Sequence, residues 1–201
     1  MARPQTASDE DILQAALRVI VRRGHDEFTL SEVAEEVGLS RAAVILRFKG
    51  TAALKLTLTA HIVERFEQAL RSLPVSCSGD GLLELVAFIG RKITSQGSLT
   101  AFMRTFHSNI KDSELAKLEM RRAQALRDAV AERMPATVIA HDSAVTAFVA
   151  HIGGCVMQWE VAGDADACSY LVERTIEWLK LARVPYSQRV ATASARLAVA
   201  S

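Results

Sequence analysis

Residues 29–48, TLSEVAEEVGLSRAAVILRF, decide how this chain folds. They read as two short helices separated at Gly38, because Thr29 and Ser40 are each placed to accept hydrogen bonds from the free N–H groups of a helix start. Glu32 follows Thr29 by three residues, which is the spacing of a capping box. Gly38 supplies the backbone freedom that a tight turn after a helix requires. The stretch therefore predicts two helices joined by a turn.

The second of these helices has small residues at its leading end. Ala42 and Ala43 follow Ser40 and Arg41, and Val44, Leu46 and Phe48 come next. Small side chains let a helix approach another surface closely, which suits insertion into the major groove of DNA.

Charge is distributed unevenly around this helix, although the net charge of the chain is only +1. Arg41, Arg47, Lys49 and Lys55 lie in a window, residues 37–63, that contains no Asp or Glu. A surface that faces phosphates needs a local excess of positive charge, whatever the total charge of the chain. A chance gap between acidic residues is the alternative explanation.

A wider pattern surrounds the two helices. Its residues are Ile12, Leu13, Ala15, Ala16, Gly24, Phe28, Thr29, Val33, Ala34, Val37, Gly38, Leu39, Ser40, Arg47, Phe48 and Leu54. This pattern resembles the helix-turn-helix of the tetracycline-repressor-like (TetR) family of bacterial transcription regulators. The resemblance implies an all-α fold, a homodimer that reads a palindromic operator on double-stranded DNA, and release by a small effector.

Three positions depart from the family pattern. Ile45 stands where the family usually has Tyr, Arg47 where it has His before the Phe, and Thr51 where it has Lys. The Tyr and the Lys typically hold phosphates in the family. DNA binding by this chain therefore either depends on other residues or is weaker. The residues expected at the DNA are Thr29, Ser40, Arg41, Ala42, Ala43, Arg47, Lys49, Thr51 and Lys55.

The rest of the chain also reads as helices. Apolar periodicity and caps predict helices over residues 8–23 and 51–72, and then over 82–94, 99–109, 113–134, 137–161 and 165–181, with a loop at 76–81. We expect a DNA-binding domain in residues 1–50 and a ligand-binding and dimerisation domain in 51–184. Residues 185–201 are weakly patterned, so we expect frayed helix or disorder there.

Composition limits the class of protein. Half of the 201 residues are hydrophobic and only 5% are aromatic, which favours helices. No apolar run is long enough to span a membrane and no secretory segment is evident, so a cytoplasmic protein is expected. Cys77, Cys155 and Cys168 form no CxxC pair, so we expect buried free thiols, with a redox-sensing cysteine as the alternative.

An irregular apolar cluster in the second domain suggests an effector site. Apolar walls that contain Met and an occasional polar group suit a small hydrophobic ligand. Ordinary core packing is the alternative for each of these residues. The candidates are Phe102, Met103, Phe106, His107, Met120, Phe148, His151 and Cys155.

The last two predicted helices each have a wide apolar side, which predicts a four-helix interface between two copies of the chain. Gly153 and Gly154 would permit close backbone approach. Packing within one chain is the alternative. The expected interface residues are Ile152, Gly153, Val156, Trp159, Leu171, Thr175 and Trp178.

No constellation in the sequence supports catalysis, and no cofactor or metal is expected. His61 and Glu64 lie one helical turn apart, but no second pair completes a metal site. We therefore expect a DNA-binding transcription regulator, most commonly a repressor, and not an enzyme. The alternative is a helical ligand-binding or dimerisation module that does not bind DNA, which the three departures would favour.

Overall fold

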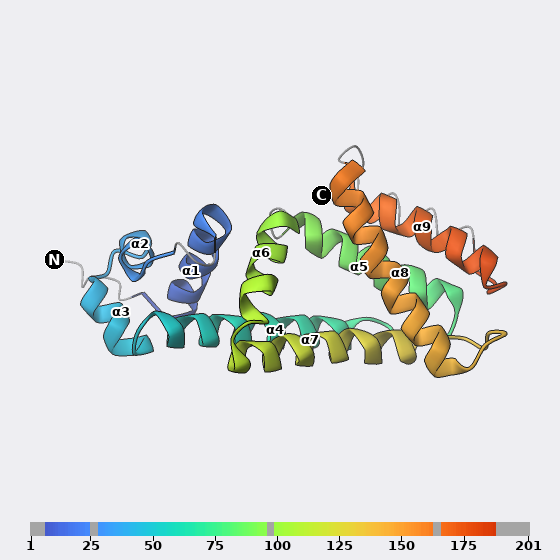
Figure 1. The fold of residues 1–201 in the computed structure, drawn as a ribbon, viewed down its shortest axis with the longest axis horizontal. Helices are drawn as coiled ribbons and strands as arrows, with labels where there is room; N and C mark the ends of the chain where they lie inside the picture. The colour runs from blue at the N-terminus through green and yellow to red at the C-terminus, as the bar shows by residue number, and fades with distance from the viewer. Residues whose placement is uncertain (1–6, 25–27, 96–98, 163–165, 188–201) are drawn as a thin grey trace. The chain divides into compact units, whose positions relative to one another are not determined.

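The computed structural model of the chain describes residues 7–24, 28–95, 99–162 and 166–187. Every regular element within these ranges is an α-helix (Figure 1), so the all-α prediction is confirmed. The helices are α1 (Asp9–Arg23), α2 (Leu30–Glu36), α3 (Arg41–Phe48), α4 (Thr51–Ser72), α5 (Gly79–Ser95), α6 (Leu99–Asn109), α7 (Ser113–Ala131), α8 (His141–Ala162) and α9 (Ala167–Leu181).

Side-chain caps start the first three helices where the sequence predicts. Ser8 and Asp11 form a capping box at α1, and Thr29 and Glu32 form a second one at α2. Ser40 accepts a hydrogen bond of 3.1 Å from the N–H of Ala43 at the start of α3. These caps fix the helix starts because they satisfy N–H groups that have no partner within the helix.

The helices α1 to α3 and the first turns of α4 enclose one hydrophobic core. Its central residues come from all four helices and from the segment before α2. They are Ile12, Ala16, Val19, Phe28, Val33, Val44, Phe48, Leu54 and Leu58, each less than 9% exposed. This core fixes which face of α3 points inward and which faces solvent.

Two compact units make up the chain. The first contains Met1–Arg65 and Thr100–Arg121, and the second contains Phe66–Leu99 and Arg122–Ser201. Helices α4 and α7 therefore contribute residues to both units. The expected boundary at residue 50 separates functions, whereas these units are defined by packing and divide α4 after residue 65. The functional boundary therefore stays a prediction.

The core of the second unit is built around α5, α8 and α9. Gly90 of α5 allows this packing, since a Cβ at that position would lie 2.4 Å from the Cα of Cys168 on α9. Arg133 is 1% exposed, and its guanidinium donates hydrogen bonds to the main-chain carbonyls of Ala129, Leu73 and Pro74. The end of α4 is thereby held to the end of α7 within this unit.

Four helix boundaries differ by two residues or more from those expected. Helix α5 begins at Gly79, inside the expected loop at 76–81. Its two glycines serve close packing instead of a turn, since a Cβ on Gly81 would lie 2.0 Å from the carbonyl oxygen of Ser76. Helix α7 ends at Ala131 instead of 134. Helices α8 and α9 begin at His141 and Ala167 instead of 137 and 165.

Residues 184 and 187 of the carboxyl-terminal segment make defined contacts. Val184 is buried, and the N–H of Ser187 donates a hydrogen bond of 2.7 Å to Asp80 at the start of α5. The rest of the tail, residues 188–201, lies outside the described residues. Among the described helices, none combines the length and the apolar character that crossing a bilayer requires.

All three cysteines are free thiols, as expected. Cys155 and Cys168 are buried, but Cys77 is exposed, which corrects the expectation of three buried thiols. Its Sγ lies 3.3 Å from the carbonyl oxygen of Met134, to which it donates. Burial raises the pKa of the Cys155 and Cys168 thiols, so both are less reactive than an exposed cysteine.

Candidate nucleic-acid interface

Helix α3 is anchored on one side and open on the other. Val44 is fully buried and Phe48 is 7% exposed, one turn apart on the inner face. Lys49 ends the helix in the left-handed region, with φ 59°, and its N–H donates to the carbonyl of Ile45 at 2.7 Å. The next residue, Gly50, has φ 120°, so the chain turns sharply into α4.

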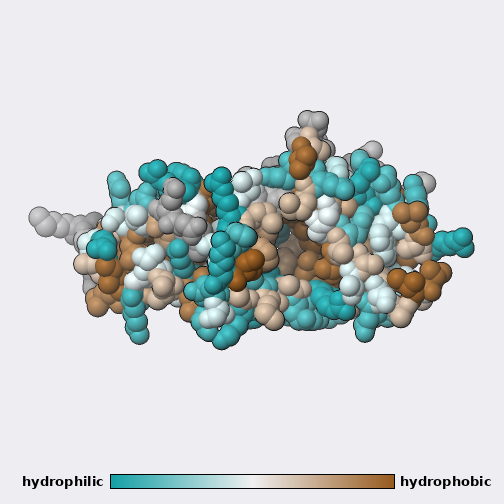
Figure 2. Space-filling model, viewed as in Figure 1, coloured by the Kyte–Doolittle hydropathy of each residue, from teal (hydrophilic) through white to brown (hydrophobic). Residues whose placement is uncertain are grey.

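The open face of α3 carries both cationic and apolar side chains. Arg41, Ala42 and Lys49 are exposed, and Ala43 is half-buried. Leu46 is 84% exposed, and hydrophobic surface lies over α3 in Figure 2. Helical spacing could have indicated this exposure, because Leu46 lies two residues from both Val44 and Phe48 and so falls on the opposite face.

Arg47 makes a hydrogen bond and an ion pair to other residues of the same chain. Its Nη1 donates to the main-chain carbonyl of Ala7 and lies 3.5 Å from a carboxylate oxygen of Asp9. Its side chain is 30% exposed. The structure therefore ties the last turn of α3 to the start of α1 through a residue that we expected at a phosphate, and this contact was not predicted.

The other expected DNA contacts lie at helix starts. Thr51 is exposed at the first position of α4, and the Nζ of Lys55, one turn later, lies 5.4 Å from the centre of the Phe28 ring. Thr29 accepts from the N–H of Glu32 at 3.3 Å, and its hydroxyl donates to the Glu32 carboxylate at 2.9 Å. The hydroxyls of Thr29 and Ser40 thus serve as caps, and their side chains remain exposed.

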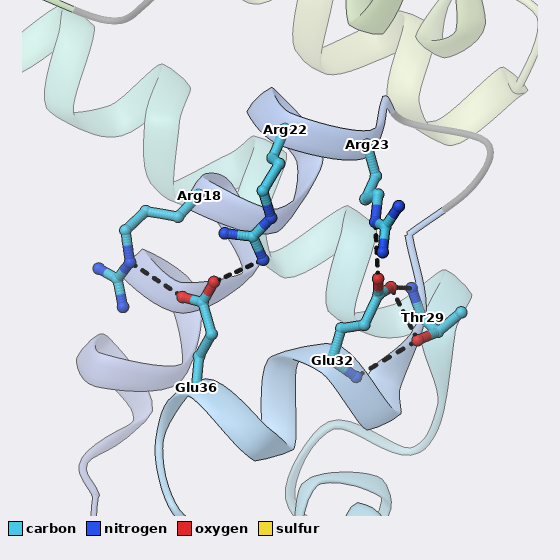
Figure 3. Close-up of polar contacts among 6 residues, drawn as sticks. All are labelled: Arg18, Arg22, Arg23, Thr29, Glu32 and Glu36. Atoms are coloured by element: carbon cyan, nitrogen blue, oxygen red, sulfur yellow. Dashed lines mark hydrogen bonds and ion pairs between the residues drawn. The ribbon is translucent and has the colours of Figure 1, made fainter.

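Two carboxylates of α2 are held by arginines of α1 (Figure 3). Glu36 lies 2.7 Å from Arg22 and 3.0 Å from Arg18, and Glu32 lies 2.9 Å from Arg23. The hydrogen bond from Arg22, followed by the one from Arg18, lowers the pKa of Glu36, and the hydrogen bond from Thr29 is the main cause that lowers the pKa of Glu32. Each of these two acids is thereby paired with at least one arginine of α1.

The expected effector residues of the first unit lie on α6 and α7. The rings of Phe102 and Phe106 stack with their centres 6.3 Å apart. Met103 is half-buried, while His107 is exposed and Met120 is 72% exposed. The stacked pair on α6 is thus the part of this set that the structure brings together.

The other expected effector residues lie in the second unit, on α8. Phe148 is fully buried, and its ring meets that of Trp178 edge-on with centres 4.7 Å apart. The Sγ of Cys155 lies 3.6 Å from Nε2 of His151. Burial lowers the pKa of His151, so the imidazole is favoured in its neutral form. Phe148, His151 and Cys155 therefore form one contiguous group.

The expected interface residues fall into two sets. Ile152, Leu171 and Thr175 are at most 3% exposed within a single chain, so their own unit already covers them. Val156, Trp159 and Trp178 are half-buried. Gly153 and its neighbour Gly154 face open space, with no atom within 4 Å of a Cβ built on either. An apolar side that the sequence assigns to a partner is thus partly intramolecular core.

A metal site is not evident in the part of the chain that the structure describes: no three His, Cys, Asp or Glu side chains are grouped there in a way that could hold an ion. His61, which the sequence pairs with Glu64, instead lies 3.2 Å from Glu10 of α1. Arg65 lies 3.3 Å from the same carboxylate. These residues join α1 to α4 in the first unit.

Comparison by sequence identifies one family. Residues 12–56 match the family model described as bacterial regulatory proteins, tetR family. The matched segment covers α2 and α3 completely, together with most of α1 and the start of α4. No curated protein matches the chain by sequence.

Comparison by structure finds regulators of the same fold. The transcriptional regulator FadR of Bacillus subtilis, solved with stearoyl-CoA, has 14% identity and a TM-score of 0.61, covering 84% of this chain and 96% of that one. A TetR transcription regulator of Haloarcula marismortui has 16% identity and a TM-score of 0.67, with coverage of 88% and 97%. SmeT, the repressor of the Stenotrophomonas maltophilia multidrug efflux pump SmeDEF, has 16% identity and a TM-score of 0.63, with coverage of 89% and 91%.

Proposed function

Because this chain belongs to the tetR family of bacterial regulatory proteins through residues 12–56, we propose that it is a cytoplasmic transcription regulator that acts as a repressor. It binds a palindromic operator as a homodimer and is released by a small apolar effector. The observation that carries the proposal is that Arg41 and Lys49 are exposed at the two ends of α3, in a window without acidic residues. The buried side of the same helix holds this face in place.

Helix α3 enters the major groove with its leading end toward the bases. Ala42 and Ala43 allow close approach there, and Arg41 reaches a guanine edge or a phosphate. Lys49, Thr51 and Lys55 contact the backbone from the end of α3 and the start of α4. Contacts to phosphates set register and affinity, whereas contacts to bases set specificity.

Two copies are needed to read a palindrome. Two α3 helices related by a two-fold axis match half-sites whose centres are about 34 Å apart, or a multiple of that distance. The exposed side of α8 is the part of the second unit that supports self-association most directly, because Gly153 and Gly154 leave it without bulk. We assign the dimer contact to this side of α8, together with the half-buried Val156, Trp159 and Trp178.

The effector proposal rests on two aromatic groups and on two similar proteins. Phe102 and Phe106 form one group, and Phe148 with His151 forms the other. The solved structure of FadR is a complex with stearoyl-CoA, and SmeT is the repressor of a multidrug efflux pump. A ligand releases DNA only to the extent that it binds one conformation of the protein better than the other.

The alternative is a helical ligand-binding or dimerisation module without DNA binding. Ile45 and Thr51 favour it, because they replace the side chains that usually hold phosphates, and Arg47 is occupied by Ala7 and Asp9. Salt dependence separates the two functions, since each protein contact with a phosphate contributes about 0.9 to the slope of log K against log salt.

The test begins with selection of bound duplexes from a random pool by the parent protein, followed by affinity measurements at several salt concentrations. Arg41→Ala and Lys49→Ala should each weaken binding, and a lost phosphate contact should reduce the slope by about 0.9. Arg71→Ala is the matched control, because it removes an exposed arginine from the last turn of α4 in the second unit. Failure of the parent to enrich any duplex would favour the alternative.

A further inference from the structure

The open face of α3 carries a large apolar side chain where DNA-facing helices usually present hydrogen-bonding groups. Leu46 is 84% exposed. Single exposed leucines are common on protein surfaces, so exposure alone indicates nothing. The position is informative, because Leu46 lies on the helix that the proposed function places in the major groove.

The surroundings of Leu46 limit what it can contact. A helical side chain leans toward the preceding turn, where Ala42 and Ala43 are too small to cover it. Ser40 caps the helix through its hydroxyl, and Arg47 is held by Ala7 and Asp9. Between Arg41 and Lys49 the exposed residues of α3 are Ala42, Leu46 and Arg47. Only Arg47 among them carries hydrogen-bonding groups, and its Nη1 is engaged by Ala7 and Asp9.

The major groove offers one apolar feature at its base edges. This is the C5 methyl group of thymine, whereas the other groups at the edges are hydrogen-bond donors and acceptors. A leucine cannot satisfy a donor or an acceptor, and covering one without a partner is costly. A leucine in the groove is therefore accommodated best against a methyl group.

We propose that Leu46 determines specificity by packing on the methyl group of a thymine in each operator half-site, with Ala42 and Ala43 making room for the contact. The inference rests on the proposed function, since it needs α3 in the major groove. Recognition at this base pair depends on apolar contact, while Arg41 and Lys49 supply charge on either side.

The methyl group can be removed from the DNA without any other change. Deoxyuridine differs from thymidine only by lacking the C5 methyl group, and it keeps the same hydrogen-bonding groups. Each thymine of the selected operator is replaced in turn, symmetrically in both half-sites, and affinity is measured for the parent, for Leu46→Ala and for Leu181→Ala. Leu181 is the matched control, because it is an equally exposed leucine, 85%, at the end of α9.

One thymine position is expected to respond. Its replacement should weaken binding by the parent about fourfold for each half-site, which is the effect of one buried methyl group. Leu46→Ala should bind the thymine operator more weakly and should bind the thymine and deoxyuridine operators equally. Leu181→Ala should behave as the parent, and thermal unfolding should be unchanged in both variants because neither leucine is buried.

The outcomes separate this inference from the proposed function. If the parent binds a duplex in a manner that depends on Arg41 but no thymine responds, or if Leu46→Ala keeps the full response, the assignment of Leu46 is wrong and the proposed function stands. If the parent binds no duplex at all, both are wrong. Weaker binding by Leu46→Ala together with self-association that Leu46 controls would also overturn the inference, since the leucine would then serve a protein contact.

Discussion

Arg47 and Asp9 lie 3.5 Å apart, from guanidinium nitrogen to carboxylate oxygen, and the same nitrogen donates to the carbonyl of Ala7. Arg47 belongs to the last turn of α3, and Asp9 is the first residue of α1. The contact therefore fixes the helix that we place in the groove against the helix that begins the chain. We therefore expect Arg47 to affect DNA binding by holding α3 in position.

This relationship predicts different effects for two arginines. Arg47→Ala should lower the free energy of unfolding by about 1 kcal/mol, the scale of one hydrogen bond and one exposed ion pair, and should weaken DNA binding as a consequence. Arg41→Ala should weaken DNA binding without changing stability, because Arg41 is exposed and no contact of its side chain is found among the described residues. Thermal unfolding and duplex affinity of both variants provide the measurement.

Arg47→Lys serves as the control for this prediction. Lysine keeps a donor for the Ala7 carbonyl and a charge for Asp9, so it should recover part of the lost stability. If Arg47→Ala unfolds at the same temperature as the parent but loses DNA affinity, Arg47 contacts the DNA directly and the positioning role is wrong.

The ion pairs between α1 and α2 predict a dependence of stability on pH. The pKa values of Glu36 and Glu32 lie below their ordinary value of 4.5 in the folded chain. A carboxyl group with a lowered pKa stabilises the fold above its unfolded pKa, and this contribution is lost as the pH falls through the folded value. We therefore expect the contribution of these two carboxylates to the unfolding temperature to be steady above about pH 5 and to decline below about pH 4.5.

Glu36→Gln should be less stable than the parent at pH 7 and should lose less stability on acidification, because its contribution to the pH dependence is gone. Glu35→Gln is the matched control, since it removes a neighbouring carboxylate without disturbing Arg18 or Arg22. Circular dichroism melts between pH 3.5 and 7 test the prediction. Parallel curves for Glu36→Gln and the parent would show that these pairs contribute nothing measurable.

The sequence predicts helices well where an end is marked by local chemistry. Helix α4 occupies residues 51–72 as expected, because Gly50 precedes it, Pro74 follows it and its apolar residues recur every four positions. The capping boxes at Ser8 and Thr29 likewise fix the starts of α1 and α2. These signals depend only on residues close in sequence, so they can be recognised without the fold.

The features that the sequence does not predict depend on contacts between residues that are far apart in the sequence. Gly81 suggests a loop in the sequence, yet it lies in α5, where the carbonyl of Ser76 leaves no room for a side chain. Leu171 and Thr175 lie on an apolar face that the sequence cannot assign to the same chain or to a partner. The engagement of Arg47 by Ala7, 40 residues away, leaves no local pattern.

Gly90 predicts a strong effect of a small substitution. The Cβ of Gly90→Ala would lie 2.4 Å from the Cα and 2.8 Å from the N of Cys168, so α5 and α9 have to move apart. We expect a loss of about 1–3 kcal/mol in the free energy of unfolding, despite the higher helix propensity of alanine. The double variant Gly90→Ala, Cys168→Ala should not recover the lost stability, because the two atoms nearest to the new Cβ are backbone atoms of residue 168. Recovery in denaturant unfolding would mean that side chains set the spacing.

The exposed side of α8 predicts how the proposed dimer can be separated. Asp142 is exposed in the first turn of α8. Beyond that turn the exposed residues are uncharged: 146, 147, 150, 153, 154, 157, 158, 161 and 162. Arginine at Gly154 has space within one chain, since nothing lies within 4 Å of a Cβ there, but in a dimer it would place a charge between the subunits. Gly154→Arg should therefore sediment as a folded monomer and bind the operator about 100-fold more weakly, because the second half-site no longer benefits from linkage.

Ala123→Arg is the matched control, since it places the same side chain on an exposed position of α7 and should stay dimeric. A Gly154→Arg protein that sediments as the parent does would move the interface to another surface and leave the DNA-binding assignment untouched.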